Sequence, residues 1–484
     1  MSEKNSIGGS RGSEAGGGDS AEGPGPRLFS GVSPDQVAAD LAPLVDFRRE
    51  GLPMGALKAL VEERLLPHLM RYDLPSFQGL FNGPLEEGAA YGAHLALDWN
   101  QGVTNWQVSP GGATLEELSC QALCRLFGLA PGADATVLYS GTYANQQALY
   151  MALYHRAERE GFDFAAKGLA GFRDPARLAV VVSEDAHFSM RHAVRFLGLG
   201  EDALIQVGVD GNRRMDADEL ERTLGELRST RDVFCVVATA GTTSTGSVDP
   251  MERVADLARD DGAWLHVDGA YGLAYALVPE KAELFRGLDR ADTVAWDPHK
   301  QMGVPIPNSI LFARNRELFR PMALFSHYWN RADAPGPNPG LKSIPSTRPL
   351  AALSLVTSIR HQGLDGLVSR LRKPLVAIRD FYETLLDQPD MEPLHTPDTG
   401  ILCFRVVPES VPPEDLDRLQ EFIYQRILLA GKRIVSVSNL GGMATLRAVA
   451  IIPEVTVDAL LETVAEARRI ATTFEPKTLS PGSD

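Results

Sequence analysis

A lysine stands directly after apolar residues in the stretch VAWDPHKQMGVPIPNS, residues 294–309. The apolar residues predict a short buried strand, and a charged group beside a buried strand loses favourable hydration. Lys300 is therefore paired with an anion, deprotonated by burial, or used to form a covalent bond. Polar residues elsewhere in the chain decide which of these explanations holds.

Polar residues follow several other apolar segments in the same way. Asp268 ends the segment AWLHVD, His187 comes shortly after LAVVVS, and Thr243 comes shortly after DVFCVVAT. Gly141 and Thr142 follow TVLY and begin a helical pattern. Each residue alone has an ordinary structural explanation, such as a helix cap or a loop side chain. The ordered set, spread over several strands, indicates a shared site.

One cofactor, pyridoxal 5'-phosphate, needs this combination of groups. It requires a lysine amine that bonds covalently to its aldehyde, which explains a lysine at this position. A carboxylate facing the pyridine nitrogen keeps that nitrogen protonated, and a protonated ring withdraws electrons more strongly. A helix N-terminus attracts the phosphate, and an imidazole can stack on the ring. The sequence therefore predicts a pyridoxal phosphate enzyme.

The elements that must position these groups alternate between short apolar strands and amphipathic helices. This alternation predicts an α/β fold, with a mostly parallel sheet that binds ligands at the carboxyl ends of its strands. After residue 346 the pattern changes to a smaller α+β domain. The expected parts of the chain are a disordered tail over 1–30, a helical segment over 31–108, a large domain over 109–345, a small domain over 346–473 and a tail over 474–484.

Composition excludes several classes of function. The 484 residues carry a net charge of −16, which argues against nucleic acid and against an anionic membrane surface as partners. No apolar run has the length of a membrane span, and the Gly/Ser-rich start has no apolar secretion signal, so a cytoplasmic protein is expected. Four cysteines are too few for a disulfide framework, and the sequence has no HExxH or paired CxxC motif, so no metal is predicted.

Four segments resemble the signatures of the pyridoxal-phosphate-dependent group II decarboxylases. This family includes glutamate, cysteine sulfinate, aromatic amino-acid and archaeal tyrosine or aspartate decarboxylases. The segments are VAWDPHKQMGVPIPNSILF, SEDAHFSMRHAVRFLGLG, ATAGTTSTGSVDP and HVDGAYG. The resemblance extends from about residue 74 to residue 471. It implies the pyridoxal phosphate transferase fold type I, with a seven-stranded sheet, and a homodimer whose active site lies at the subunit interface.

The resemblance also implies roles around the cofactor ring. Lys300 would carry the covalent link to the cofactor, and Asp268 would pair with the pyridine nitrogen. His187 would stack on one face of the ring, and Ala270 would lie against the other. Thr243 would support the ring substituents.

Further implied contacts surround the cofactor phosphate. Gly141, Thr142 and His299 would bind it. Asp297 stands where many relatives have asparagine, and a second anion there would repel phosphate unless it is turned away or protonated.

The loop FSHYWNRADAPGPNPGLKS, residues 325–343, has the composition of a mobile lid. Family decarboxylases carry a tyrosine in the matching loop, so Tyr328 is the expected proton donor to the substrate Cα, with His327 as an alternative. Arg348, in KSIPSTRP, is expected to bind a substrate carboxylate through two parallel hydrogen bonds, with a helix-start ion pair as the alternative explanation.

The implied reaction is decarboxylation of an L-amino acid to its amine and CO2. The Met-Gly-Val-Pro segment and Arg348 favour an acidic substrate, namely aspartate, cysteine sulfinate or glutamate. The PIP that follows the lysine resembles the archaeal enzymes and favours an aromatic, tyrosine-type substrate. A decarboxylating oxidase, an aminotransferase or another lyase on the same fold, and a non-catalytic interaction protein, are the competing hypotheses.

Overall fold

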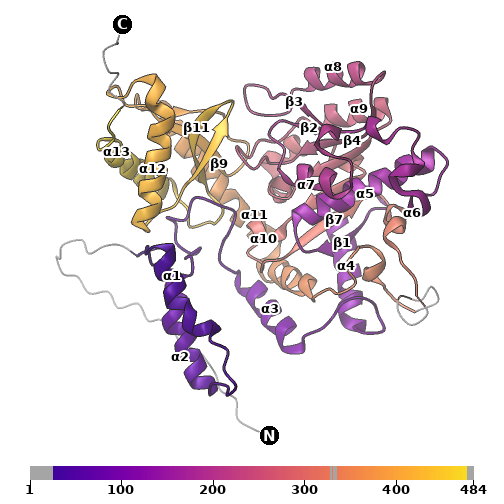
Figure 1. Cartoon of the computed structure of the whole chain (residues 1–484), viewed down its shortest axis with the longest axis horizontal. Helices are drawn as coiled ribbons and strands as arrows, with labels where there is room; N and C mark the ends of the chain where they lie inside the picture. The colour runs from indigo at the N-terminus through magenta and orange to yellow at the C-terminus, as the bar shows by residue number, and fades with distance from the viewer. Residues whose placement is uncertain (1–25, 327–329, 331–334, 477–484) are drawn as a thin grey trace.

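The protein is represented by a computed structural model that describes residues 26–326, 330 and 335–476 (Figure 1). Within these ranges no helix is both long and apolar enough to cross a membrane.

A seven-stranded sheet forms the centre of the larger part of the molecule. Its spatial order is β1-β7-β6-β5-β4-β2-β3, and only β7 runs antiparallel to its neighbours. The mostly parallel sheet predicted from the sequence is confirmed. The strands are β1 (Asp134–Leu138), β2 (Leu178–Ser183), β3 (Leu204–Val207), β4 (Asp232–Thr239), β5 (Trp264–Asp268), β6 (Thr293–Trp296) and β7 (Ser309–Ala313).

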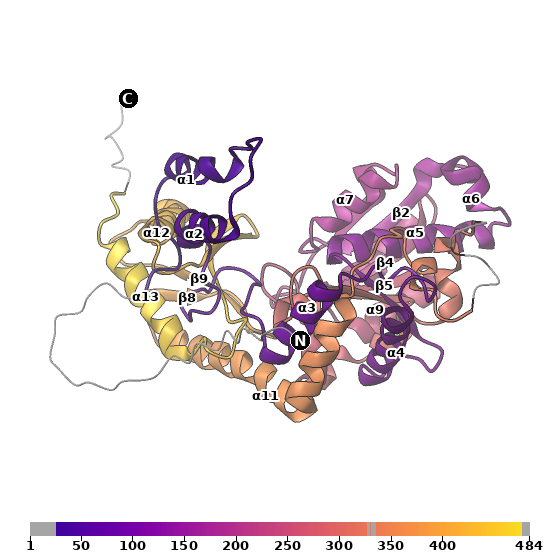
Figure 2. The same cartoon turned by 90° about the horizontal axis from the view of Figure 1, so that it is seen from below.

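Helices cover both faces of this sheet. Both faces need cover because the strands carry apolar side chains on each of them. On one face α5 (Gly141–Arg159) and α7 (Ser189–Phe196) pack on the sheet through one hydrophobic cluster. On the other face α4 (Pro110–Leu126), α8 (Ala217–Leu227) and α9 (Met251–Asp261) pack through a second cluster. Figure 2 shows α4 and α9 on the opposite side of the sheet from α5 and α7. The sheet is therefore the middle layer of three, and only its ends are open to a ligand.

A smaller C-terminal part contains an antiparallel sheet of four strands in the order β10-β11-β9-β8. The long helix α11 (Ala351–Leu386) leads into it and is interrupted at Gly363, where φ is +66°. Figure 2 shows this helix passing from the larger part to the smaller one. The domain boundaries given above stay predictions. The remaining elements are β8 (Met391–Pro393), β9 (Ile401–Val406), α12 (Leu416–Ala430), β10 (Ser436–Leu440), β11 (Met443–Val449) and α13 (Val457–Ala471).

The N-terminal segment is packed less closely than the rest. Helices α1 (Pro34–Leu41) and α2 (Met54–Arg64) contain no buried residue and stand apart from the two sheets (Figure 1). By contrast, α3 (Glu87–Trp99) packs along α11. The tail predicted over 1–30 lies largely outside the described residues.

A buried ion cluster fixes the chain just before α11. Lys342 Nζ lies 2.6 Å from Asp134 Oδ2 and 2.7 Å from Glu117 Oε2, and all three side chains are buried. Arg316 pairs with the same Glu117 at 2.9 Å, but its side chain is 59% exposed. The cluster therefore ties residue 342 to α4 and β1 through a lysine that water does not reach.

Lys342→Met should destabilise the protein strongly, because only the exposed Arg316 then remains beside the buried Asp134 and Glu117. Breaking a buried ion pair in this way costs about 3–5 kcal/mol. The matched control is Arg316→Met, whose exposed pair with Glu117 should contribute less than about 1 kcal/mol. Urea unfolding of both variants measures the difference, and equal, small losses of unfolding free energy would contradict this account of the cluster.

Candidate active site

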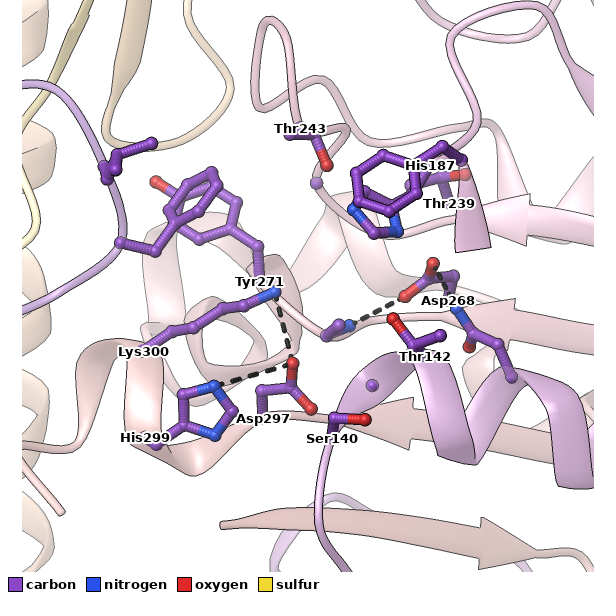
Figure 3. Close-up of a pocket in the computed structure, with 17 residues that line it drawn as sticks. Ser140, Thr142, His187, Thr239, Thr243, Asp268, Tyr271, Asp297, His299 and Lys300 are labelled. Carbon is purple, nitrogen blue, oxygen red and sulfur yellow. Dashed lines mark hydrogen bonds and ion pairs between the residues drawn. The ribbon is translucent and has the colours of Figure 1, made fainter. Parts of the chain in front are cut away.

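A cavity of about 350 Å³ opens at the carboxyl ends of the central strands. All eight residues predicted to contact the cofactor line it, together with several that the sequence did not indicate (Figure 3). The eight are Gly141, Thr142, His187, Thr243, Asp268, Ala270, His299 and Lys300.

Lys300 reaches the cavity from α10 (Pro298–Gln301), the short helix that follows β6. Its Nζ lies 3.2 Å from Asp297 Oδ2 and 5.3 Å from the centre of the Phe81 ring. Its side chain is 20% exposed, so the amine is accessible from the cavity. Of the three explanations for this lysine, the structure shows the paired form, held where a ligand aldehyde can reach it.

Asp268 ends β5 at the base of the cavity and is 5% exposed. Its Oδ1 accepts from Ala270 N at 3.1 Å, and its Oδ2 accepts from Asn145 Nδ2 at 2.8 Å. Among the described residues, no lysine or arginine lies within ion-pair distance of Asp268, although a buried carboxylate is stable only when its charge is compensated. This arrangement suits a cationic ligand group such as a protonated pyridine.

His187 follows β2 and lies beside Asp268 in Figure 3. Its Nδ1 accepts from Ser189 N at 3.2 Å, so the proton of the neutral ring is on Nε2. Burial lowers the pKa of His187 below its ordinary value, so the ring is neutral near pH 7. Its ring centre lies 4.0 Å from that of Phe188. A flat, neutral ring in this position can cover one face of a planar cofactor.

The start of α5 forms an anion cradle. The N-terminus of a long helix attracts phosphate through its free N–H groups and its dipole. A Cβ at Gly141 would lie 2.7 Å from Asp297 Oδ2 and 3.0 Å from Ala270 Cβ, so glycine keeps the cradle open. His299 Nδ1 donates to Asn308 O at 2.6 Å, and burial lowers the pKa of His299.

Thr239 was not indicated by the sequence. Its buried Oγ1 lines the cavity and has no hydrogen-bond partner among the described residues. A buried hydroxyl without a partner loses free energy that a bound ligand can restore. The uncompensated carboxylate, the open cradle and this hydroxyl together fit pyridoxal phosphate.

Arg348 does not belong to this cavity, which corrects the prediction that it binds substrate. It is 3% exposed and pairs through Nη2 with the equally buried Glu116, and Nη2 also donates to Val137 O at 2.8 Å. A substrate carboxylate would have to displace Glu116 to bind there. The alternative explanation, an ion pair at a helix start, describes Arg348 better. Tyr328 and His327 lie outside the described residues.

Arg447, on β11, is a functional candidate that the residue patterns alone did not single out. Its guanidinium lies 4.9 Å from the centre of the Phe81 ring, the ring that also faces Lys300. It is 4% exposed, and neither its Nε nor its Nη2 has a hydrogen-bond partner among the described residues. No described carboxylate pairs with it, and burial lowers its pKa. The sequence feature that could have indicated Arg447 is its place as a charged residue inside the apolar segment TLRAVAII.

Fold and site together define an α/β enzyme that binds pyridoxal phosphate. Residues 44–407 match the pyridoxal-dependent decarboxylase conserved domain, so the chain belongs to the pyridoxal-dependent decarboxylase family. The protein is a pyridoxal-phosphate-dependent amino-acid decarboxylase, a carboxy-lyase. The predicted family, fold class, cofactor and enzyme class are confirmed.

Several known proteins are similar to this chain. The L-2,4-diaminobutyrate decarboxylase of Rhizobium meliloti (strain 1021) is 29% identical over 452 residues, covering 91% of this chain and 88% of that protein. The cysteine sulfinic acid decarboxylase of Homo sapiens is 30% identical over 341 residues, covering 69% and 67%.

A similar solved structure is the glutamate decarboxylase domain of diaminobutyrate-pyruvate transaminase and L-2,4-diaminobutyrate decarboxylase from Vibrio parahaemolyticus. It has a TM-score of 0.83 at 22% identity and covers 93% of this chain and 92% of that chain. At this identity the likeness shows the fold.

Asp297→Asn should tighten pyridoxal phosphate binding. The Asp297 carboxylate borders the cradle and pairs with Lys300 and, at 3.9 Å, with His299. Removing one negative charge beside the phosphate should lower the dissociation constant about tenfold, equivalent to about 1.4 kcal/mol. Fluorescence titration of the cofactor-free protein with pyridoxal phosphate measures this. Weaker binding by the asparagine variant would show instead that Asp297 is needed to hold Lys300 and His299 in place.

Proposed function

We propose that the protein decarboxylates an acidic L-amino acid, namely aspartate, cysteine sulfinate or glutamate, to the amine and CO2. The observation that carries this proposal is Arg447, a buried guanidinium with no described carboxylate partner, close to the ring that faces Lys300. A planar guanidinium binds a carboxylate through two parallel hydrogen bonds. The Met-Gly-Val-Pro sequence after Lys300 also supports an acidic substrate.

Bound pyridoxal phosphate supplies an electron sink for the charge that departing CO2 leaves on the substrate Cα. Lys300 provides the amine that holds the cofactor covalently, and Asp268 keeps its pyridine nitrogen protonated. His187 covers one face of the ring, while the start of α5, with Gly141, binds the phosphate. A substrate carboxylate held by Arg447 fixes the substrate orientation, and orientation decides which bond to Cα breaks.

The proton that Cα receives is proposed to come from Tyr328. The support is its position in a Pro/Gly-rich loop that matches the tyrosine-bearing loop of the family. A tyrosine hydroxyl delivered by such a loop can protonate Cα while the loop excludes water.

A second copy of the chain is proposed to cover the N-terminal segment. Helices α1 and α2 bury no residue, although short helices without tertiary packing are marginal in water. Large apolar side chains on and between these helices are exposed, including Phe47 at 90%, Met54 at 64% and Val45 at 63%. Exposed apolar surface of this kind is typical of an obligate interface, which supports a homodimer.

A diaminobutyrate substrate is the second candidate, because two similar proteins are L-2,4-diaminobutyrate decarboxylases. Its second ammonium group would need an available carboxylate. The carboxylates that line the described cavity are Asp268, which faces the cofactor site, and Asp297, which pairs with Lys300. If Arg447 instead holds the α-carboxylate, an aromatic substrate fits the apolar lining from Leu80, Phe81 and Phe188.

Arg447→Met should raise KM for the preferred acidic substrate about 10- to 100-fold, because losing the hydrogen bonding between this guanidinium and the substrate carboxylate costs about 1.5–3 kcal/mol. Arg447→Lys is the control, because lysine keeps the positive charge but cannot form two parallel hydrogen bonds to one carboxylate. The assay incubates holoenzyme with single amino acids and quantifies CO2, amine, aldehyde and H2O2. Preferred turnover of 2,4-diaminobutyrate or an aromatic amino acid would overturn the acidic assignment, and aldehyde with H2O2 would indicate an oxidase.

Tyr328→Phe should lower kcat by about 10²–10⁴-fold, the usual contribution of a positioned proton donor. The affinity for pyridoxal phosphate should not change. His327→Gln, which tests the alternative donor, and Trp329→Phe, a neighbouring aromatic control, should each keep most of the activity. Full turnover by the Tyr328 variant would remove this residue from the mechanism.

A further inference from the structure

A row of buried polar side chains leads from Asp268 into the core. Asp268 Oδ2 accepts from Asn145 Nδ2 at 2.8 Å, and Asn145 Oδ1 lies 2.9 Å from His266 Nε2. His266 Nδ1 lies 3.0 Å from Thr293 Oγ1, which also accepts from Trp264 Nε1 at 3.0 Å. None of these side chains is more than 5% exposed. Asn145, His266, Thr293 and Trp264 are called the donor chain below.

Strand periodicity explains how the donor chain is assembled. Trp264, His266 and Asp268 alternate along β5, so their side chains share one face of the strand. Thr293 is the register partner of His266 on the neighbouring strand β6. Asn145 comes from the start of α5, which packs against this face of the sheet. Three elements therefore bring the polar groups together in one line.

The far end of the donor chain fixes the direction of its hydrogen bonds. An indole N–H can only donate, so Thr293 Oγ1 is an acceptor from Trp264. Complete burial lowers the pKa of His266 to about 4, so its ring is neutral and carries a single N–H near pH 7. Which ring nitrogen carries that hydrogen is decided by Asn145, at the cavity end of the donor chain.

At the cavity end, Asn145 orients its amide between two acceptors. Its Nδ2 donates to Asp268 Oδ2 and, at 2.9 Å, to Ser189 Oγ, so its Oδ1 faces His266 as an acceptor. His266 therefore carries its hydrogen on Nε2, and its bare Nδ1 accepts the hydroxyl hydrogen of Thr293. Every hydrogen bond of the donor chain then points toward Asp268.

The reverse direction is less favourable. It would require a protonated Asp268 that donates to Asn145, and a His266 that donates from Nδ1 to Thr293. Thr293 Oγ1 would then accept from both Trp264 and His266, and its own hydrogen would have no acceptor in the chain. A buried donor without a partner loses about 1–3 kcal/mol. Asn145 therefore presents a donor to Asp268, and a donor stabilises the ionised form of a carboxyl group more than the neutral form.

We propose that Asn145, His266, Thr293 and Trp264 are positioning residues that hold Asp268 as a carboxylate and so keep the pyridine nitrogen of bound pyridoxal phosphate protonated. The proposal rests on the proposed pairing of Asp268 with that nitrogen. A carboxylate whose negative charge is already stabilised by donors takes up the proton of its partner less readily. The other titratable groups that line the same cavity as Asp268 are His187, Tyr271, Asp297, His299 and Lys300.

The test compares Thr293→Val with Thr293→Ser, because Thr293 does not line the cavity and only the hydroxyl distinguishes the pair in this role. Holoenzyme containing ¹⁵N-labelled pyridoxal phosphate is titrated with pH, and the nitrogen chemical shift reports protonation of the ring. In the valine variant the equilibrium between the ring nitrogen and Asp268 should shift about tenfold toward a protonated Asp268, so the nitrogen signal near pH 7 should move toward that of an unprotonated ring. The serine variant should match the unaltered protein.

Asn145→Leu is the second variant, and it should shift the same equilibrium toward a protonated Asp268 by about 10- to 100-fold, because it removes the direct donor. Asp268→Asn serves as the reference. If that variant leaves the nitrogen signal unchanged, the proposed role of Asp268 is wrong. If Asp268→Asn alters the signal but the folded Thr293→Val and Asn145→Leu proteins titrate like the unaltered one, the donor chain proposal alone fails. If Asn145→Leu does not bind cofactor, the Thr293 pair decides the matter by itself.

Discussion

Burial of the Asp268 carboxylate is the constraint on which the active site depends. An anion removed from water is stable only when donors and a cation compensate its charge. The protein supplies donors from Ala270 and Asn145 but no lysine or arginine partner within the described residues. The missing charge is one that a protonated pyridine ring can bring. The cavity therefore favours a ligand that brings a cationic group to Asp268.

Distant parts of the chain surround this carboxylate. The sheet delivers Asp268 and Lys300 at neighbouring strand ends, since β5 and β6 are paired in parallel. The segment before α3 contributes Phe81 to the cavity lining, and the C-terminal sheet contributes Arg447, whose guanidinium lies 4.9 Å from the centre of the Phe81 ring. The residues proposed to bind the cofactor thus come from the large sheet, whereas Arg447, the residue proposed to bind the substrate, comes from the smaller sheet.

Most of the fold and the cofactor site could be predicted from the sequence. Strand-like segments with polar residues at their ends predict a parallel sheet. The carboxyl ends of parallel strands lie at one edge of the sheet, so the strand order along the chain is enough to bring Lys300, Asp268 and His187 together there. Asn145 and Thr239 were missed, because an asparagine in a helix and a threonine in a strand have no distinctive pattern. Arg348 was misassigned because a sequence does not show that Glu116, 232 positions away, is its partner. The roles of Tyr328 and of a second subunit depend on parts or partners outside the described chain, and they stay predictions.

The central claim is that one lysine amine binds the cofactor covalently. Borohydride reduction of the holoenzyme, followed by proteolysis and mass spectrometry of the labelled peptide, measures this directly. The structure predicts a single pyridoxyl label on Lys300, in the peptide that contains Asp297 and His299. A label on another lysine, or no label in protein saturated with pyridoxal phosphate, would contradict the account.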